Sequence, residues 1–238
     1  MALAVLSSNG MAGVLRALGP RLERAAGEAL AIRHATTAAL ASEIASGAAV
    51  DVALLTAAGI ERLAKLGRLA AGSAVVIGRS GVGLAVRAGA QRPDIATPEA
   101  LAQTLRAAAA VAYTTEGASG LHFVSVLRRL GIEADVTAKA RTRPGGLIAE
   151  LVVRGEATLA VQQISELLAV PGADYVGPLP PALQEYTIFA AGIGAASDKE
   201  AAARALVTAL AAPDAAPVIA ALGMEPAGCW EAQAPTPG

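Results

Sequence analysis

Small hydroxyl, amide and glycine residues recur where short apolar runs of this sequence end and helical patterns begin. Free backbone N–H groups at a helix start carry partial positive charge, hydroxyls and amides add donors without a full charge, and small residues let a ligand approach the backbone. This chemistry suits a small anion. The candidate ligand-binding residues are Ser7, Ser8, Asn9, Gly10, Thr36, Thr37, Thr56, Ser119, Gly145, Gly146 and Gln163.

For any one of these junctions, helix capping is the simpler interpretation, because Ser, Thr and Asn are favoured N-cap residues. Four or more such junctions in both halves of the chain favour a shared binding site. Arg79, Arg141 and Arg143 are further candidates, since arginine binds carboxylates bidentately. We therefore expect these residues to converge on one cleft that accepts an anionic ligand.

Candidates for acid–base chemistry are few. Glu116 and Glu166 are the carboxylates nearest the expected cleft, and we interpret both as solvated loop charges. His34 and His122 are the only histidines, and Cys229 is the only cysteine. Because no Cys or paired carboxylates accompany the histidines, we expect no metal and no cofactor.

Composition excludes several classes of protein. The 238 residues are 54% hydrophobic and 16% charged, with a formal net charge of -1. The sequence has no block of basic residues that would indicate nucleic-acid binding. The longest apolar runs, such as 107–113, fall far below the ~20 residues of a membrane-spanning helix. The N-terminus lacks the basic region of a secretory signal. We expect a periplasmic protein if a signal was removed, and otherwise a cytoplasmic one.

Apolar runs alternate with helical patterns, which predicts an α/β fold built from βαβ units. The long runs 74–86 and 186–193 are glycine-containing or bendable strands that can carry the chain between two lobes. We therefore predict one lobe from residues 1–81 and 186–238 and a second from 82–185. Within the second lobe we predict a weak strand at 135–139 and a helix at 145–154.

Several stretches, taken in order and spacing, resemble the molybdate-binding-protein family of ABC transporters and its divergent relatives, which include aconitate-isomerase-like proteins. The resemblance implies the type II periplasmic-binding-protein fold, in which two lobes joined by two crossing strands close on a ligand. The matching stretches are Val5–Met11, Ala35–Leu40, Ile44–Gly47 with Asp51–Thr56, and Gly155–Ala157 with Val161–Glu166.

The family's binding residues carry over in part. Its first hydroxyl loop falls on Ser7 to Gly10, with the ligating serine replaced by Gly10, and its second loop falls on Thr36 and Thr37. Its backbone donor at a second-lobe helix start falls on Gly145 and Gly146, and its ligating tyrosine falls on Gln163. These two replacements argue against molybdate and favour a longer, asymmetric ligand such as a small polycarboxylate.

Two functions stay open at this point. One is a substrate-binding protein that delivers an oxyanion or organic acid to an ABC transporter permease. The other is an isomerase that moves a proton and a double bond in an unsaturated polycarboxylate, which needs a general base such as Glu116, His34 or His122. A ligand-responsive sensor has less support, because the sequence shows no fused output domain.

Overall fold

The computed structural model describes residues 2–230, which divide into two compact units. The first unit falls within Met1–Arg79 and Ile188–Gly238, and the second is Ser80–Thr187. The chain passes from one unit to the other along strand β4 (Val75–Arg87) and returns along strand β9 (Tyr186–Ile193). Each unit has its own sheet and its own hydrophobic core, and each is described by itself below.

The sheet of the first unit contains three parallel strands, β2 (Leu30–Ala35), β1 (Leu3–Ser8) and β3 (Val52–Thr56), in that spatial order. Strand β9 pairs antiparallel with β3, and the two-residue strand β10 (Glu225–Pro226) pairs antiparallel with β4. Because β2, β1 and β3 are parallel, their carboxyl ends meet at one edge of the sheet. The first three polar junctions of the sequence therefore lie side by side.

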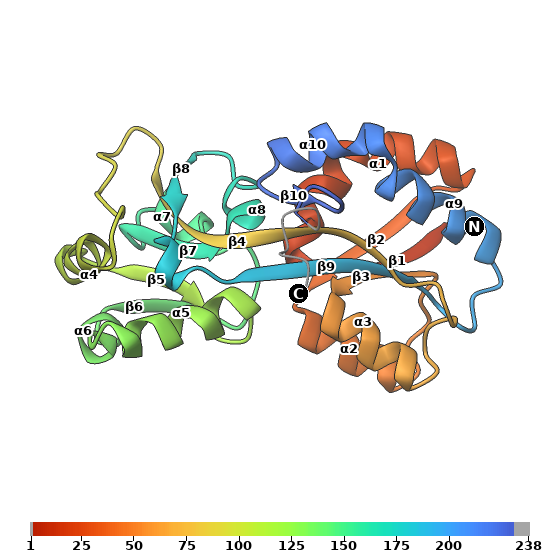
Figure 1. The fold of residues 1–238 in the computed structure, drawn as a ribbon, viewed down its shortest axis with the longest axis horizontal. Helices are drawn as coiled ribbons and strands as arrows, with labels where there is room; N and C mark the ends of the chain where they lie inside the picture. Colours follow the sequence, from red (N-terminus) through yellow and green to blue (C-terminus); the bar gives the residue numbers. More distant parts are fainter. Residues whose placement is uncertain (1, 231–238) are drawn as a thin grey trace, which may run out of the picture. The chain divides into compact units, whose positions relative to one another are not determined.

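Helices cover both faces of this sheet (Figure 1). Helices α1 (Ala12–Ala26), α9 (Glu200–Ala211) and α10 (Ala216–Ala221) share one face, with 3-10 turns at Asn9–Met11 and Pro213–Ala215. Helices α2 (Thr37–Ala45) and α3 (Ala57–Lys65) pack on the other face.

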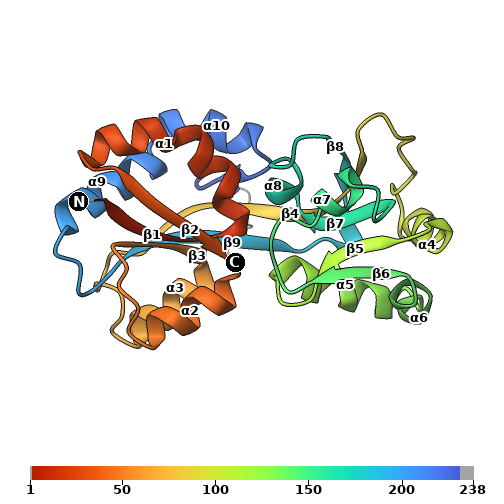
Figure 2. The ribbon, with the colours of Figure 1, turned by 180° about the vertical axis from the view of Figure 1, so that it is seen from behind.

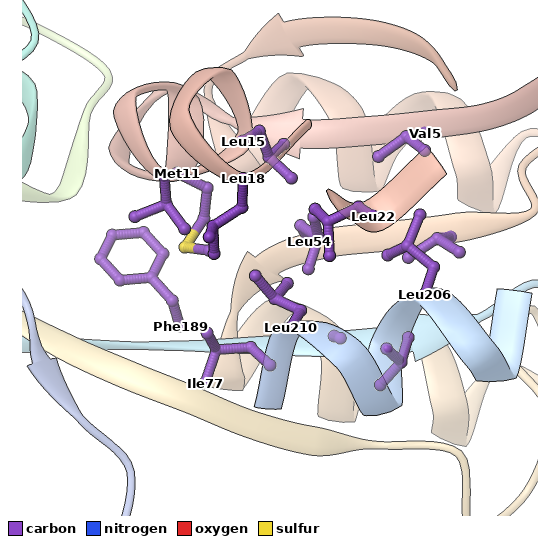
Figure 3. Close-up of a cluster of buried hydrophobic side chains, with 14 of the residues drawn as sticks. Val5, Met11, Leu15, Leu18, Leu22, Leu54, Ile77, Phe189, Leu206 and Leu210 are labelled. Carbon is purple, nitrogen blue, oxygen red and sulfur yellow. The ribbon is translucent and has the colours of Figure 1, made fainter. Parts of the chain in front are cut away.

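The larger core of the first unit lies between the sheet and α1 and α9 (Figure 3). Leu15, Leu22, Leu206 and Leu210 are all buried there. Full burial of such a side chain stabilises the fold by about 1.5–3 kcal/mol. The ring of Phe189, from β9, lies beside Met11 in this cluster, which places an aromatic side chain next to the loop after β1.

The second unit has the strand order β4, β7, β5, β6, and β8 also pairs with β4. Strands β5 (Val111–Thr114), β6 (Ala140–Arg143) and β7 (Leu159–Gln163) are mutually parallel, whereas β8 (Ala173–Pro178) and β7 run antiparallel to β4. The carboxyl ends of β5 and β7 therefore lie at the same edge of this sheet.

Helices also cover both faces of the second sheet (Figure 2). Helices α4 (Pro98–Ala107), α5 (Ala118–Arg129) and α6 (Glu133–Thr137) pack in one core. The short helices α7 (Glu150–Val153) and α8 (Ile164–Leu167) pack in the other, and a 3-10 turn spans Pro181–Leu183.

The α/β fold class predicted from the sequence is confirmed, and two local predictions are wrong. The segment expected as a strand at 135–139 is largely helix α6, with strand β6 starting only at Ala140. Glu133 and Asp135 lie in the first turn of α6, where acidic side chains favour the helix dipole. The helix expected at 145–154 is reduced to α7, because Gly146 has a φ of 89° that breaks a helix.

Among residues 2–230, no helix is by itself long and apolar enough to cross a membrane. Glu200–Ala211 and Pro213–Ala221 satisfy the criteria of length and composition only when taken together, and they bend by 58° where they meet.

Candidate functional site

The loop after β1 combines buried hydroxyls with a crowded glycine. Ser7 is buried and its Oγ donates a hydrogen bond of 3.1 Å to the carbonyl of Ser8. Ser8 is also buried, and its side chain makes no capping bond to the turn that follows. The half-buried Asn9 begins that turn. At Gly10, an added Cβ would lie 2.4 Å from Cζ of Phe189, so the backbone here must remain bare.

Three threonines at the next junctions make structural hydrogen bonds. Thr36 Oγ1 accepts from the Ala39 N–H at 3.2 Å, and Thr56 Oγ1 accepts from the Gly59 N–H at 3.2 Å. Both are N-caps, so the capping interpretation holds for them. Thr37 Oγ1 accepts from the Thr56 N–H at 3.2 Å, which ties the second junction to the third. In each case the hydroxyl acts as acceptor, so its own proton stays available to an anion.

These residues share one edge of the first unit. In the β1–β2 register, Ser7 faces His34 and Ser8 faces Ala35, while Ser7 also faces Leu54 of β3. Burial lowers the pKa of His34, and hydrogen bonding to the backbone of Ser7 and Ser8 works against that lowering. The environment of His34, at the same edge as the hydroxyl loops, therefore favours the neutral imidazole.

The N-terminus of α5 forms the most distinctive polar site of the second unit. Thr114 and Ser119 are only 2% and 1% exposed, yet Thr114 Oγ1 and Ser119 Oγ make no hydrogen bond among the described residues. The N-cap residue is Gly117, so no side chain caps the helix. A Cβ at Gly120 would lie 1.7 Å from the Thr114 carbonyl oxygen, so only glycine fits this first turn. The site offers hydroxyl donors and free helix N–H groups together.

The Gly145–Gly146 segment is a loop rather than a helix start. Buried Gln162 fixes it, because Nε2 donates to the Gly146 carbonyl at 2.7 Å and Oε1 accepts from the Ile148 N–H at 2.8 Å. Within residues 2–230, the N–H groups of Gly145 and Gly146 have no assigned acceptor. The loop therefore presents backbone donors without help from a helix. The supporting role of Gln162 was not predicted from the sequence.

Gln163 makes structural hydrogen bonds within the second unit. In the amide orientation that satisfies both ends, its nitrogen donates to the carbonyls of Ser80 at 2.8 Å and Gly81 at 3.0 Å. Its oxygen accepts from Thr187 Oγ1 at 2.6 Å. The residue is 3% exposed and joins the end of β7 to the two strands that connect the units. A direct contact between Gln163 and a ligand stays a prediction.

Glu166 is not the solvated loop charge that we expected. It is 7% exposed in α8, where its carboxyl group accepts a hydrogen bond from the Gln163 N–H. Burial raises its pKa to about 8, and the Gln163 bond only partly opposes this rise. Its neighbour Ser165 is also buried, with an Oγ that has no partner among the described residues. Glu116, by contrast, is exposed as expected.

The candidate arginines make contacts within their own units. Arg79 pairs with Glu225 at 2.7 Å, and Arg143 pairs with Glu150 at 3.3 Å. Arg141 donates to the adjacent Ala140 carbonyl at 3.2 Å. These partners lower the availability of the arginines for a ligand, so the polar edges depend on dipoles more than on full positive charges.

The second histidine also has structural partners. His122 Nε2 lies 2.8 Å from the Leu183 carbonyl oxygen, and Nδ1 lies 2.7 Å from Glu185 Oε2. Cys229 is exposed and free. In the part of the chain that the structure describes, no group of three His, Cys, Asp or Glu side chains is arranged to hold a metal ion.

The fold and these polar strand ends define a binding-protein architecture. The chain belongs to the family of bacterial extracellular solute-binding proteins, whose sequence profile matches residues 3–225. Its fold is that of the type II periplasmic binding proteins.

Individual relatives differ in how similar they are to this chain. An aconitate isomerase from Pseudomonas sp. is 39% identical over 230 residues, covering 94% of this chain and 87% of that protein. The periplasmic molybdate-binding protein of Azotobacter vinelandii superposes with a TM-score of 0.78 at 20% identity, covering 93% and 98% of the two chains. The sulfate-binding protein SubI of Mycobacterium tuberculosis superposes with a TM-score of 0.68 at 18% identity, covering 100% and 92%.

Proposed function

We propose that this protein binds a small di- or tricarboxylate through the polar ends of its strands. The observation that carries the proposal is the N-terminus of α5, where Thr114 and Ser119 hold buried hydroxyls without partners. Leaving buried hydroxyls unpaired costs about 1–3 kcal/mol each. A carboxylate that accepted from these hydroxyls and from the helix N–H groups would remove that cost.

The loop after β1 supports a carboxylate over a compact tetrahedral oxyanion. An oxyanion needs a close cage of donors, because each unpaired oxygen forfeits a charge-assisted hydrogen bond. Phe189 excludes any side chain at position 10, and the Gln163 amide is already bonded to backbone and to Thr187. A ligand carboxylate could use Ser8 and Thr36 at the edge of the first unit, and Ser119 and Gly145 offer such donors at the edge of the second.

The family supports a role in solute capture outside the cytoplasm, with delivery to an ABC transporter permease. A site built from neutral donors fits the release of a carboxylate to a permease, because it binds the anion without placing full positive charges against it. Fractionation of the native host tests the compartment. Recovery of the protein only in the cytoplasmic fraction would contradict this part of the proposal.

Calorimetry with citrate, cis-aconitate, trans-aconitate, tricarballylate, molybdate and sulfate tests the ligand class. We expect a tricarboxylate to bind at least tenfold more tightly than either inorganic anion. Ser119→Ala should weaken the binding of that carboxylate at least fivefold, because it removes one buried donor. Ser125→Ala is the matched control, since the Ser125 hydroxyl donates to the His122 carbonyl on the exposed side of the same helix. Submicromolar molybdate binding without a carboxylate response would overturn the proposal.

Isomerisation of an unsaturated polycarboxylate is the second candidate function. The Pseudomonas relative named aconitate isomerase supports it, because that relative shares 39% of its residues with this chain over most of both lengths. Buried Glu166, whose pKa is raised to about 8, is suited to proton transfer near pH 7, and His34 is a second candidate base. Proton NMR of cis-aconitate incubated with the purified protein tests this function directly. Binding without any appearance of the trans isomer would leave solute binding as the function.

A further inference from the structure

Glu166 is the buried ionisable group that the second unit leaves without a counter-ion. Among the described residues, its interaction is the hydrogen bond from the Gln163 N–H, and no cation pairs with it. In a short helix whose N-cap is Gln163, Glu166 at the third position makes one half of a capping box, while the Gln163 side chain makes no capping bond. A glutamine would make the same cap without the cost of desolvating a carboxylate. Helix capping alone therefore does not explain why an ionisable carboxyl group occupies this buried position.

Among residues 2–230, the elements around Glu166 supply no cation that pairs with it. Helix α8 packs against β7 and β8. Strand β7 carries no ionisable side chain. On β8, Asp174 accepts from the Gly89 N–H at 3.0 Å, and Tyr175 is neutral because burial raises its pKa to about 12. The charged or titratable groups on α5 and α7 have partners of their own: His122 with Glu185, Arg128 with Glu133, Arg129 with the Ala182 carbonyl, and Glu150 with Arg143 and Arg154.

The position of Glu166 brings it to the polar edge of the second unit. Strands β5 and β7 are parallel neighbours, with Ala112 opposite Ala160, so Thr114 and Gln162 end at the same level of the sheet. Helix α8 starts directly after β7, and helix α5 starts shortly after β5. The three buried hydroxyls without partners, those of Thr114, Ser119 and Ser165, all belong to this edge.

We propose that Glu166 is the catalytic acid–base residue of this protein, moving one proton between two carbons of an unsaturated polycarboxylate. The inference rests on the second candidate function given above. The ionised carboxyl group takes a proton from the saturated carbon next to the double bond. The C–H electron pair forms the new double bond, and the original π pair moves to the far carbon. That carbon then takes the proton back from Glu166, so no oxidant or co-reactant is consumed.

The buried setting favours this reaction. The ionised carboxylate is a stronger base there than in water, and the protonated acid that forms is the proton donor for the far carbon. The hydroxyls and helix N–H groups at the same edge would hold a ligand carboxylate and the negative charge that spreads onto it when the proton leaves.

The isosteric variant Glu166→Gln distinguishes a capping role of Glu166 from a catalytic one. Its amide oxygen still accepts from the Gln163 N–H, but it has no carboxyl group to transfer a proton. Cis-aconitate is the probe, with affinity measured by calorimetry and turnover by proton NMR in water and in D2O. We expect Glu166→Gln to keep its affinity within threefold of the parent protein and to lose turnover at least 100-fold, along with deuterium exchange at the allylic carbon. Glu99→Gln, an exposed glutamate in the first turn of α4, should leave both unchanged.

Turnover of Glu166→Gln within threefold of the parent protein would overturn the assignment to this residue. A parent protein that binds cis-aconitate without isomerising it or exchanging its protons would overturn the catalytic role and leave the binding function standing. A parent protein that binds no carboxylate would overturn both. A second readout is Glu166→Asp, which should retain weak turnover with a shifted pH profile, whereas a purely structural residue would leave the profile in place.

Discussion

The ring of Phe189 occupies the space into which a side chain at position 10 would project, because a Cβ on Gly10 would lie 2.4 Å from its Cζ atom. Phe189 faces Thr56 across the β3–β9 pair and is 2% exposed. The Phe189 side chain from β9 therefore limits position 10 of the loop after β1 to glycine. Glycine at position 10 and phenylalanine at position 189 form a coupled pair.

Introducing alanine at position 10 should destabilise the protein. Gly10→Ala forces the Phe189 ring or the loop to move, and overpacking of this kind costs about 1–3 kcal/mol. Urea unfolding measures the loss. The double variant Gly10→Ala with Phe189→Leu should be less destabilised than the sum of the two single variants, since the smaller side chain relieves the clash. Additive single effects would show that the two positions are not coupled.

The stability of the protein should fall between about pH 4.5 and pH 8 because of Glu166. In the unfolded chain its carboxyl group ionises at the ordinary pKa of 4.5, whereas in the folded chain burial raises the pKa to about 8. The unfolded state therefore releases this proton first, and each unit of pH in that window favours unfolding.

Glu166→Gln removes that dependence, so it should raise the melting temperature at pH 8 more than at pH 5. Differential scanning calorimetry at both values measures the difference. Glu99→Gln is the matched exposed control and should show no such contrast. An equal shift of the Glu166→Gln variant at both pH values would mean that this carboxyl group ionises normally in the folded protein.

Loss of the Gln162 side chain should release the glycine loop. Gln162→Ala removes the part-buried bond to the Gly146 carbonyl and the buried bond to the Ile148 N–H. Removing the second bond leaves a buried backbone N–H unpaired, at a cost of about 1–3 kcal/mol. Hydrogen exchange should become faster at Ile148 and its neighbours, while the amides of β1 and β3 in the first unit keep their protection. Unchanged exchange at Ile148 would contradict this role.

The cap of α3 offers a graded test of Thr56, which the sequence also predicts as a ligand contact. Thr56→Ala should destabilise the protein by about 1 kcal/mol, because the Gly59 N–H loses its acceptor. Thr56→Ser keeps the hydroxyl and should restore most of this loss. Carboxylate affinity should fall in Thr56→Ala and recover in Thr56→Ser. An alanine variant that loses stability with undiminished affinity would restrict Thr56 to capping.

Much of the architecture could be predicted because its signals are local. Apolar runs bounded by small polar residues locate β1, β2 and β3 to within a few residues, and the glycine-rich run locates β4. Helix α8 gave no signal because it has only four residues, and Gly177 and Pro178 interrupt the apolar run of strand β8. Helix α6 was predicted as a strand because its few apolar positions fit the spacing of a helix or of a strand. At Glu166, the sequence showed a carboxylate after a strand but could not show that tertiary packing would bury it. The partners of Gln163 at Ser80, Gly81 and Thr187 lie 24 or more positions away and gave no local signal.

The two segments that form the first unit have a consequence for biosynthesis. Strand β9 completes its sheet beside β3, and α9 packs against α1, yet both emerge from the ribosome only after the whole second unit. The second unit is one uninterrupted segment with its own core. Since domains fold as units as they are synthesised, we expect the second unit, which is complete before α9 is made, to reach its native state first. The N-terminal strands, with Leu54 and Val52 still uncovered, are then the part of the nascent chain that most needs protection from aggregation.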